Sequence, residues 1–252
     1  MKERLVQIKE FIDKRGRVTF NEVEKAFPDV SSMTLRRDFI RLEENNAIIR
    51  VSGGAISVET VLKAKEADFA ERIVYNSEEK KEIAEKAVEL VTPKSCVFID
   101  GGSTTTYFAR ALPDDHYYVL TNAMNIAETV LRKENPTVAL MGGDVKKNNF
   151  ITVGRSCAEF IQKINIQTAV MTATGYVSET GCFTCGSQSE AEVKALVIQK
   201  ATCVIMLLDS SKVGKHTPYN FASLKHIDCI VTDKNFPDEI KKQMINMNVK
   251  VY

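Results

Sequence analysis

Apolar residues recur at helical spacing through the first part of the chain. Leu5, Ile8, Phe11 and Ile12 share one face of a predicted helix, and residues 15–17 break this pattern. The pattern resumes over two shorter stretches and fades near residue 45. We therefore expect three short helices at the start of the chain.

Hydrogen-bonding signals mark the ends of these helices. Thr19, with Glu22 three positions later, predicts a capping box for the second helix. Ser31 or Ser32 is expected to cap the third helix. Two asparagines at 45–46 favour a left-handed stop at its end.

A small hairpin is predicted next, because β-type runs at 47–51 and 55–58 flank a glycine-containing turn. Three helices and a hairpin are typical of a winged helix-turn-helix, so residues 1–58 are expected to form a DNA-binding domain. Residues 59–75 are charged and mixed, which indicates a linker or a connecting helix.

From about residue 76 the pattern changes to apolar runs that alternate with helices, the first helix being expected at 78–91. Continuous apolar strands joined by helices are typical of a mostly parallel sheet covered on both faces. We therefore predict an α/β fold class: a winged helix-turn-helix followed by a mostly parallel α/β domain over 76–252. The predicted strands are 96–100, 117–121, 138–141, 168–172, 203–209 and 229–232.

The outward face of the third predicted helix carries side chains suited to DNA. Thr34, Arg37 and Arg41 lie opposite the buried Leu35, and Arg36 lies at the margin. Guanidinium groups bind guanine edges or phosphates, and a threonine hydroxyl binds bases or the backbone. These residues are therefore expected to enter the major groove.

In the hairpin, Arg50 is expected to lie along a DNA phosphate or to enter the minor groove.

The alternative to DNA binding is a helical packing domain whose Arg37 and Arg41 form a solvated face paired with Asp38 and Glu44. Charge does not separate the two, since the whole chain carries +1 and the first 58 residues +2, from eleven Lys and Arg against nine Asp and Glu. The assignment depends on where the arginines lie.

Six scattered cysteines, three of them in strand-like apolar runs, indicate a reducing compartment. No apolar run reaches the roughly 18 residues that span a membrane, and the charged start lacks the apolar region of a secretory signal. We therefore expect a cytoplasmic protein with no membrane partner.

Cys182 and Cys185 form a CxxC pair, but no second pair follows to complete a zinc site. We therefore expect this pair to lie in a glycine-flanked loop at the mouth of the ligand pocket described below. No metal or other cofactor is expected.

A candidate phosphate site follows the strand predicted at 96–100. Gly101 and Gly102 let the backbone approach an anion, and the helix expected at 107–112 offers unpaired N–H groups at its start. A simple helix cap is the alternative for this loop. The hydroxyl residues between the glycines and the helix are Ser103, Thr104 and Thr105.

Similar junctions follow the other predicted strands, and open α/β sheets bind ligands at that edge. Lys212 is expected to supply a cation for the phosphate. Asp100, Asn122 and Glu190 are expected to bind sugar hydroxyls, and Gly175 belongs to one of the converging loops.

The stretch 30–39, Val-Ser-Ser-Met-Thr-Leu-Arg-Arg-Asp-Phe, closely resembles the signature of the DeoR family of bacterial repressors, as do Arg50 and the Gly-Gly-Ala at 53–55. The resemblance implies that four of these residues work at the operator, with Asn46 in the place of the family's usual glycine. The four are Ser32, Thr34, Arg36 and Arg37.

Residues 76–252 resemble the DeoR-type sensor domain, which is similar in fold to ribose-5-phosphate isomerase and binds phosphorylated sugars or related intermediates. The resemblance implies a phosphate site at 103–105 with Lys212 and a sugar-facing role for Glu190. Larger side chains than usual at 172–176 predict a restricted ligand size. The matching stretches are 100–105, 121–122, 142–143, 153–154, 190–194 and 209–212.

The sequence thus predicts a repressor controlled by a phosphorylated metabolite, with no catalytic residue. Paired reading heads on a palindromic or repeated double-stranded operator require a homodimer or a homotetramer. The alternative is a sugar-phosphate isomerase-like enzyme with an appended DNA-binding module, in which Asp100 and Glu190 would be an acid–base pair. Turnover of sugar phosphates would favour the enzyme, and saturable binding without turnover would favour the sensor.

Overall fold

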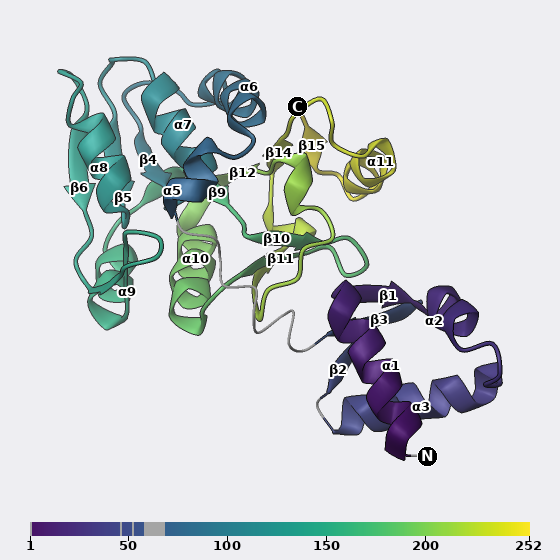
Figure 1. Cartoon of the computed structure of the whole chain (residues 1–252). Helices are drawn as coiled ribbons and strands as arrows, with labels where there is room; N and C mark the ends of the chain where they lie inside the picture. The colour runs from purple at the N-terminus through teal and green to yellow at the C-terminus, as the bar shows by residue number, and fades with distance from the viewer. Residues whose placement is uncertain (1, 46, 52, 58–68) are drawn as a thin grey trace. The chain divides into compact units, whose positions relative to one another are not determined.

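The computed structural model describes residues 2–45, 47–51, 53–57 and 69–252. The chain divides into two compact units, Met1–Lys65 and Glu66–Tyr252, named here the N-terminal unit and the C-terminal unit (Figure 1). Most of the expected linker lies outside the described residues. Its last part forms the short helix α5 (Phe69–Val74) in the C-terminal unit.

The N-terminal unit combines three helices with a three-stranded antiparallel sheet of order β1-β3-β2. The predicted hairpin is β2–β3, whereas the three-residue β1 was not predicted because its run is too short to show a period. Buried apolar residues from all three helices and the sheet form one core. The elements are α1 (Lys2–Arg15), β1 (Arg17–Thr19), α2 (Phe20–Ala26), α3 (Ser32–Glu44), β2 (Ile48–Val51) and β3 (Gly54–Ser57).

The capping signals at the two later helices are confirmed. Thr19 and Glu22 form the capping box of α2, and Ser31 begins α3, its Oγ accepting a hydrogen bond from Thr34 N at 3.3 Å. The left-handed stop is wrong for Asn45, whose φ is −88°. Instead, its backbone N and its Nδ2 both donate to Arg41 O, at 3.1 and 2.8 Å, which satisfies that carbonyl without a left-handed turn. Asn46 lies outside the described residues.

A seven-stranded sheet forms the centre of the C-terminal unit, with order β15-β14-β12-β9-β4-β5-β6 and every pairing parallel. All six predicted strands are present, and a two-residue strand, β15, extends one edge. The sheet strands are β4 (Cys96–Ile99), β5 (Tyr118–Thr121), β6 (Thr137–Leu140), β9 (Ile166–Thr172), β12 (Ala201–Leu207), β14 (Cys229–Val231) and β15 (Lys250–Val251).

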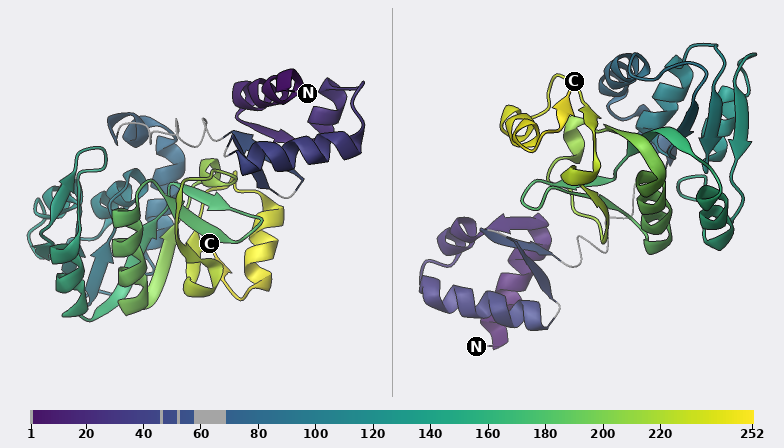
Figure 2. Two further views of the ribbon diagram at one scale, coloured as in Figure 1. Left: turned by 90° about the horizontal axis from the view of Figure 1, so that it is seen from below. Right: turned by 180° about the vertical axis from the view of Figure 1, so that it is seen from behind.

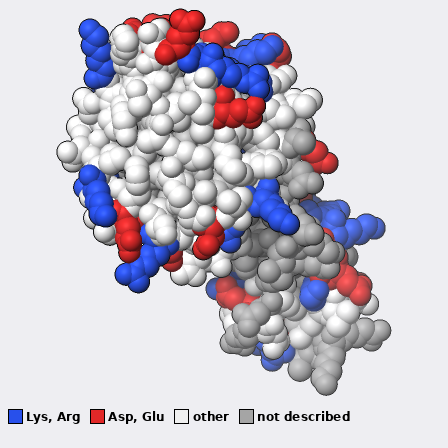
Figure 3. Space-filling model, turned by 90° about the vertical axis from the view of Figure 1, so that its left-hand side faces the viewer, with Lys and Arg blue, Asp and Glu red and all other residues white. Residues whose placement is uncertain are grey.

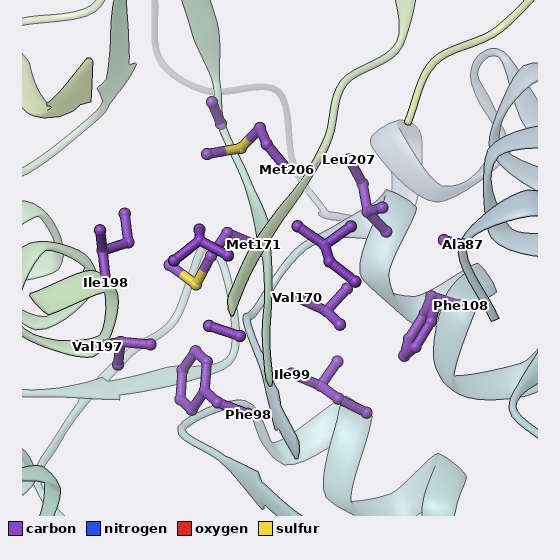
Figure 4. Close-up of a cluster of buried hydrophobic side chains, with 14 of the residues drawn as sticks. Ala87, Phe98, Ile99, Phe108, Val170, Met171, Val197, Ile198, Met206 and Leu207 are labelled. Carbon is purple, nitrogen blue, oxygen red and sulfur yellow. The ribbon is translucent and has the colours of Figure 1, made fainter. Parts of the chain in front are cut away.

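Helices cover both faces of this sheet (Figures 1 and 2). The close-up in Figure 4 shows alternate side chains of the central strands on opposite sides: Phe98 and Met171 with α10, Ile99 and Val170 with α6 and α7. This period of two explains why the strands are apolar throughout. The helices are α6 (Ser77–Val88), α7 (Ser103–Ala111), α8 (Met124–Val130), α9 (Arg155–Gln162), α10 (Gln188–Lys200) and α11 (Asp238–Asn246), with the 3₁₀ turns η1 (Ser210–Lys212) and η2 (Leu224–His226).

Two smaller antiparallel sheets correct the expected loops. The CxxC pair forms strand β11 (Cys182–Cys185), not a loop, because it pairs with β10 (Gly175–Val177) on one side and β13 (Tyr219–Ser223) on the other. The other sheet is the hairpin of β7 (Asp144–Lys146) and β8 (Ile151–Val153).

Candidate functional site

The outward face of α3 carries a row of cations. Arg36, Arg37 and Arg41 are exposed, as is Ser32 in the first turn, while the opposite face packs into the core of the N-terminal unit. Asp38 is 1% exposed and accepts two hydrogen bonds from Arg4 of α1, at 2.7 and 3.2 Å. Asp38 therefore fastens α3 to α1, which is not the solvated pairing with Arg37 and Arg41 considered above.

Neighbouring side chains position two further residues of this face. The half-buried Thr34 shares a hydrogen bond of 2.9 Å with the capping Ser31. The Arg36 guanidinium lies 4.8 Å from the ring centre of Phe20, a cation–π contact that holds it against the start of α2. Thr34 thus has a capping role, and Arg36 is pre-positioned at the surface.

A groove of about 530 Å³ separates α3 from the β2–β3 turn. On its walls are two arginines, Arg36 and Arg50, and one acid, Glu43, which forms an ion pair of 2.8 Å with Arg50. The groove is therefore cationic by one charge. Its lining residues are Phe20, Arg36, Phe39, Ile40, Glu43, Arg50, Val51, Gly53 and Gly54.

In the C-terminal unit, a polar pocket lies at the carboxyl edge of the central strands. The chain runs from β4 outward to β5 and β6 on one side, whereas β9 and β12 lie on the other, so the gap between β4 and β9 is a topological switch point, where open α/β sheets bind ligands. The pocket is lined by Arg72, Gly101, Gly102, Ser103, Thr104, Thr172, Ala173, Thr174, Glu190, Lys194 and Lys212.

The glycines of the β4–α7 loop are required by close packing. A Cβ at Gly101 would lie 2.2 Å from the Ile151 side chain, and one at Gly102 would lie 2.5 Å from the Thr172 side chain. The helix α7 begins at Ser103, four residues earlier than predicted, so the hydroxyl residues form its first turn. The first N–H groups of a helix have no intrahelical acceptor and bind anions well.

Beneath this loop lies a buried charge network. Asp100 accepts hydrogen bonds from Gly101 N at 2.9 Å and from Thr172 N at 3.1 Å, and it is also paired with Lys194. Lys194 Nζ donates to Thr172 O at 3.0 Å and lies 3.6 Å from a Glu190 carboxylate oxygen. Burial alone would lower the pKa of Lys194, but the charges of Asp100 and Glu190 outweigh it, and the pKa is raised.

Two further cations reach the pocket from other elements. Lys212 is on η1, whose start is capped by Asp209 through Ser211 N at 3.1 Å. Arg72 is on α5, and its Nη2 donates to Asn149 Oδ1 at 2.6 Å. With Lys194 and Glu190, the lining carries three cations and one carboxylate. This arrangement favours an anion.

Five of the predicted ligand residues line the pocket: Gly102, Ser103, Thr104, Glu190 and Lys212. Asp100 lies below it, with both carboxylate oxygens engaged by the network.

The structure does not bring three other predicted residues into the lining. Thr105 Oγ1 donates to Gly102 O at 3.0 Å within the helix cap, and Asn122 Nδ2 donates to Thr152 O at 2.9 Å. Gly175 is packed so closely that a Cβ would lie 2.1 Å from Lys215 O. All three serve the scaffold around the pocket.

Sequence reasoning assigned no role in the site to Arg72 or Lys194, whereas the stretch 172–176, expected to restrict ligand size, does reach the lining through Thr172, Ala173 and Thr174. Lys194 did carry a signal, because it stands four residues after Glu190 on one helix, where their side chains meet. Arg72 carried none, since it falls in the stretch assigned to the linker.

In the part of the chain that the structure describes, no cluster of three or more His, Cys, Asp or Glu side chains could hold a metal ion. The same residues include no helix that is long and apolar enough to cross a membrane.

Comparison with known proteins identifies both units. The DeoR-like helix-turn-helix domain matches residues 4–61, and the DeoR C-terminal sensor domain matches residues 75–234. The Bacillus subtilis HTH-type transcriptional repressor GlcR is 34% identical over 98% of this chain and 93% of its own length. The glycerol-3-phosphate regulon repressor of Escherichia coli is 28% identical over 96% of this chain and 94% of its own.

Among solved structures, ribose 5-phosphate isomerase A of Methanocaldococcus jannaschii matches 55% of each chain at 17% identity, with a TM-score of 0.41. The two domain matches together span most of the chain, and the full-length relatives are named as transcriptional regulators. The chain belongs to the DeoR family of DNA-binding transcriptional regulators, with an N-terminal helix-turn-helix domain and a C-terminal sensor domain.

Proposed function

We propose that this protein represses transcription by binding double-stranded operator DNA, and that a phosphorylated sugar or related metabolite in the C-terminal pocket controls it. The exposed row of Arg36, Arg37 and Arg41 on a capped helix carries the DNA-binding part. In this proposal Ser32 and Thr34 approach the DNA from the first turn of α3, and Arg50 binds a phosphate from the β2–β3 hairpin, which is the wing of the domain.

The DNA-binding part is tested by replacing Arg36 and Arg37 with Ala in the full-length protein. The probe is a set of duplexes that the wild-type protein selects from a random pool, and binding is measured by mobility shift at matched salt. We expect complete loss of the shift with unchanged circular dichroism. A double Arg132→Ala, Arg155→Ala variant removes two exposed charges from the C-terminal unit and serves as the control. An unchanged shift in the Arg36, Arg37 variant would reject the proposal.

The effector part depends on the pocket at the switch point, where the start of α7 meets Arg72 and Lys212. We propose that the phosphate binds there, against Ser103 and Thr104, and that Glu190 faces the sugar. The name of the Escherichia coli relative supports a small phosphorylated metabolite as the effector class. Asp100 is engaged by three donors and is not available as a base, which supports sensing rather than catalysis.

A thermal-shift screen tests this part with pairs of sugars that differ only in the phosphate. A ligand that binds only the native state raises the melting temperature by mass action. We expect a rise with the phosphorylated member of at least one pair and none with its unphosphorylated partner. Equal shifts for both members would reject a phosphate site, and turnover of the sugar phosphate would establish the isomerase-like alternative.

A homodimer or homotetramer in the cytoplasm completes the proposal, because two reading heads must meet two half-sites on the chromosome. Figure 3 shows a side of the C-terminal unit whose middle carries few charged side chains. This unit also exposes three large apolar side chains: Leu131 at the end of α8, Leu140 at the end of β6 and Val145 in β7. Such a surface would bring two copies together without charge repulsion. Light scattering coupled to size-exclusion chromatography would contradict this part if it found a monomer at micromolar concentration.

A further inference from the structure

Arg72 differs from the other cations of the pocket in its place along the chain. It lies on α5, between the two matched domains, which cover residues 4–61 and 75–234. Yet its side chain lines the pocket together with Gly102, Ser103 and Lys212. The first described element after the N-terminal unit thus contributes a cation to the sensor site.

The Arg72 guanidinium is aimed by its surroundings. Nη2 donates to Asn149 Oδ1 at 2.6 Å, and Asn149 is only 7% exposed. The same guanidinium lies 5.7 Å from the ring centre of Phe69, one turn earlier on α5. The bond to the Asn149 amide orients the guanidinium, whose planar array of N–H donors suits a phosphate or a carboxylate.

The other lysine of the lining has a different role. Lys194 is compensated by Asp100 and Glu190 in the buried network. The remaining lining cations, Arg72 and Lys212, approach from elements that lie outside that network. Arg72 and Lys212 therefore bring two positive charges to the pocket wall beside the start of α7, where they attract a phosphate dianion.

Contacts of α5 connect this cation to the rest of the unit. Lys80 Nζ donates to Arg72 O at 3.0 Å and also to Tyr75 O, and Tyr107 of α7 donates its hydroxyl to Ile73 O at 3.0 Å. Phe69 packs edge-on against Phe150, with ring centres 5.9 Å apart. A helix of six residues is not stable alone, so these contacts decide where α5 lies.

We propose that Arg72 is a direct ligand of the effector's anionic group and that this contact makes the packing of α5 depend on the effector. The inference rests on the proposed function, because it assumes that the pocket binds an anion. Binding fixes Arg72 against the start of α7, and α5 is thereby held at the end of the C-terminal unit that continues into the DNA-binding unit. Ligand occupancy thus changes the order of α5, the first described element after the N-terminal unit.

Inorganic phosphate is the test probe, titrated into the full-length protein by calorimetry. We expect Arg72→Ala to weaken phosphate binding by about tenfold to a hundredfold, the usual range for a charged hydrogen bond. Arg72→Gln keeps a donor for Asn149 but removes the charge, and it should lose the same factor. Arg72→Lys should recover part of the affinity. Arg155→Ala, which removes a 92% exposed arginine of α9, should bind as the wild type does.

Hydrogen exchange at the amides of α5 supplies the second readout. Saturating phosphate should slow exchange there in the wild type and leave it unchanged in Arg72→Gln. Wild-type phosphate affinity in Arg72→Gln would overturn the contact, and exchange that is insensitive to bound phosphate in the wild type would overturn the coupling. If the wild type and Arg155→Ala bind neither phosphate nor phosphate esters, the proposed function fails as well. If Lys212→Ala loses binding while Arg72→Gln keeps it, only the present inference fails.

Discussion

The two units of this protein use charged residues in opposite ways. On α3 of the N-terminal unit, three arginines stand exposed on one face, where they add little to stability. In the C-terminal unit, Asp100, Lys194 and Glu190 are buried at the pocket and form one ion-paired network. Exposed ion pairs contribute little because water screens them, whereas a buried charge without its partner is costly. Removing an arginine from the exposed face of α3 should therefore weaken DNA binding, whereas removing a charge from the buried network should destabilise the C-terminal unit.

The largest effect is expected from Asp100→Asn, which removes the closer of the two carboxylates that compensate the buried Lys194. We expect a loss of about 3–5 kcal/mol in unfolding free energy, the usual penalty for breaking a buried pair. Urea denaturation measures it, with the exposed Glu128→Gln as control. Adding Lys194→Met should restore part of the loss, and a loss under about 1 kcal/mol in the single variant would remove the contrast between the units.

The buried Lys80 of the C-terminal unit should make the stability of the protein depend on pH, which an exposed lysine would not. Burial lowers the pKa of Lys80 to about 8 from its ordinary value of 10.5. Between these two values the unfolded chain holds more protons than the folded one, so Lys80 adds stability as pH rises.

The measurement compares the wild type with Lys80→Met by urea denaturation at pH 7, 8, 9 and 10, so that other titrating groups cancel. We expect the wild type to gain about 1–3 kcal/mol relative to the variant over this range. A difference that is flat with pH would show that Lys80 is not desolvated. At pH 7 the variant also lacks the donor to Arg72 O and Tyr75 O, so α5 should exchange its amides faster.

In the N-terminal unit, Arg41→Ala should change binding and leave folding alone. The plot of log affinity against log salt has a negative slope, and removal of one phosphate contact should make it about one unit less steep. The unfolding free energy should stay within about 0.5 kcal/mol of the wild type. Arg155→Ala is the matched control, and a large loss of stability in Arg41→Ala would assign this arginine to the fold instead.

The smallest effect is expected from Glu43→Gln, which releases Arg50 of the wing from its ion pair. Both side chains are more than two-fifths exposed, so the pair is worth about 0.2–1 kcal/mol, and DNA affinity should rise by less than about fivefold. Glu10→Gln removes an exposed carboxylate from α1 as the control. An equal rise in both variants would reduce the effect to general charge.

The DNA-binding domain was largely predictable because its sequence signals are local. The cap at Ser31, the capping box of α2 and the exposed positions of Arg36, Arg37 and Arg41 all follow from spacings of three or four residues. The seven-stranded sheet was nearly as visible, since fully buried parallel strands appear as continuous apolar runs. In this sheet only the two-residue β15 was missed, whereas the short strands of the two smaller antiparallel sheets were not predicted.

Tertiary structure decided the membership of the pocket. Sequence alone indicated the loop after β4, Glu190 and Lys212, but it also suggested Asn122 and Gly175, which the fold uses for packing. It could not indicate that Arg72 reaches the same pocket or that Lys194 engages Asp100, 94 residues away. Helix spacing determines which side chains face solvent, whereas a buried charge finds its partner only when distant strands and helices pack together.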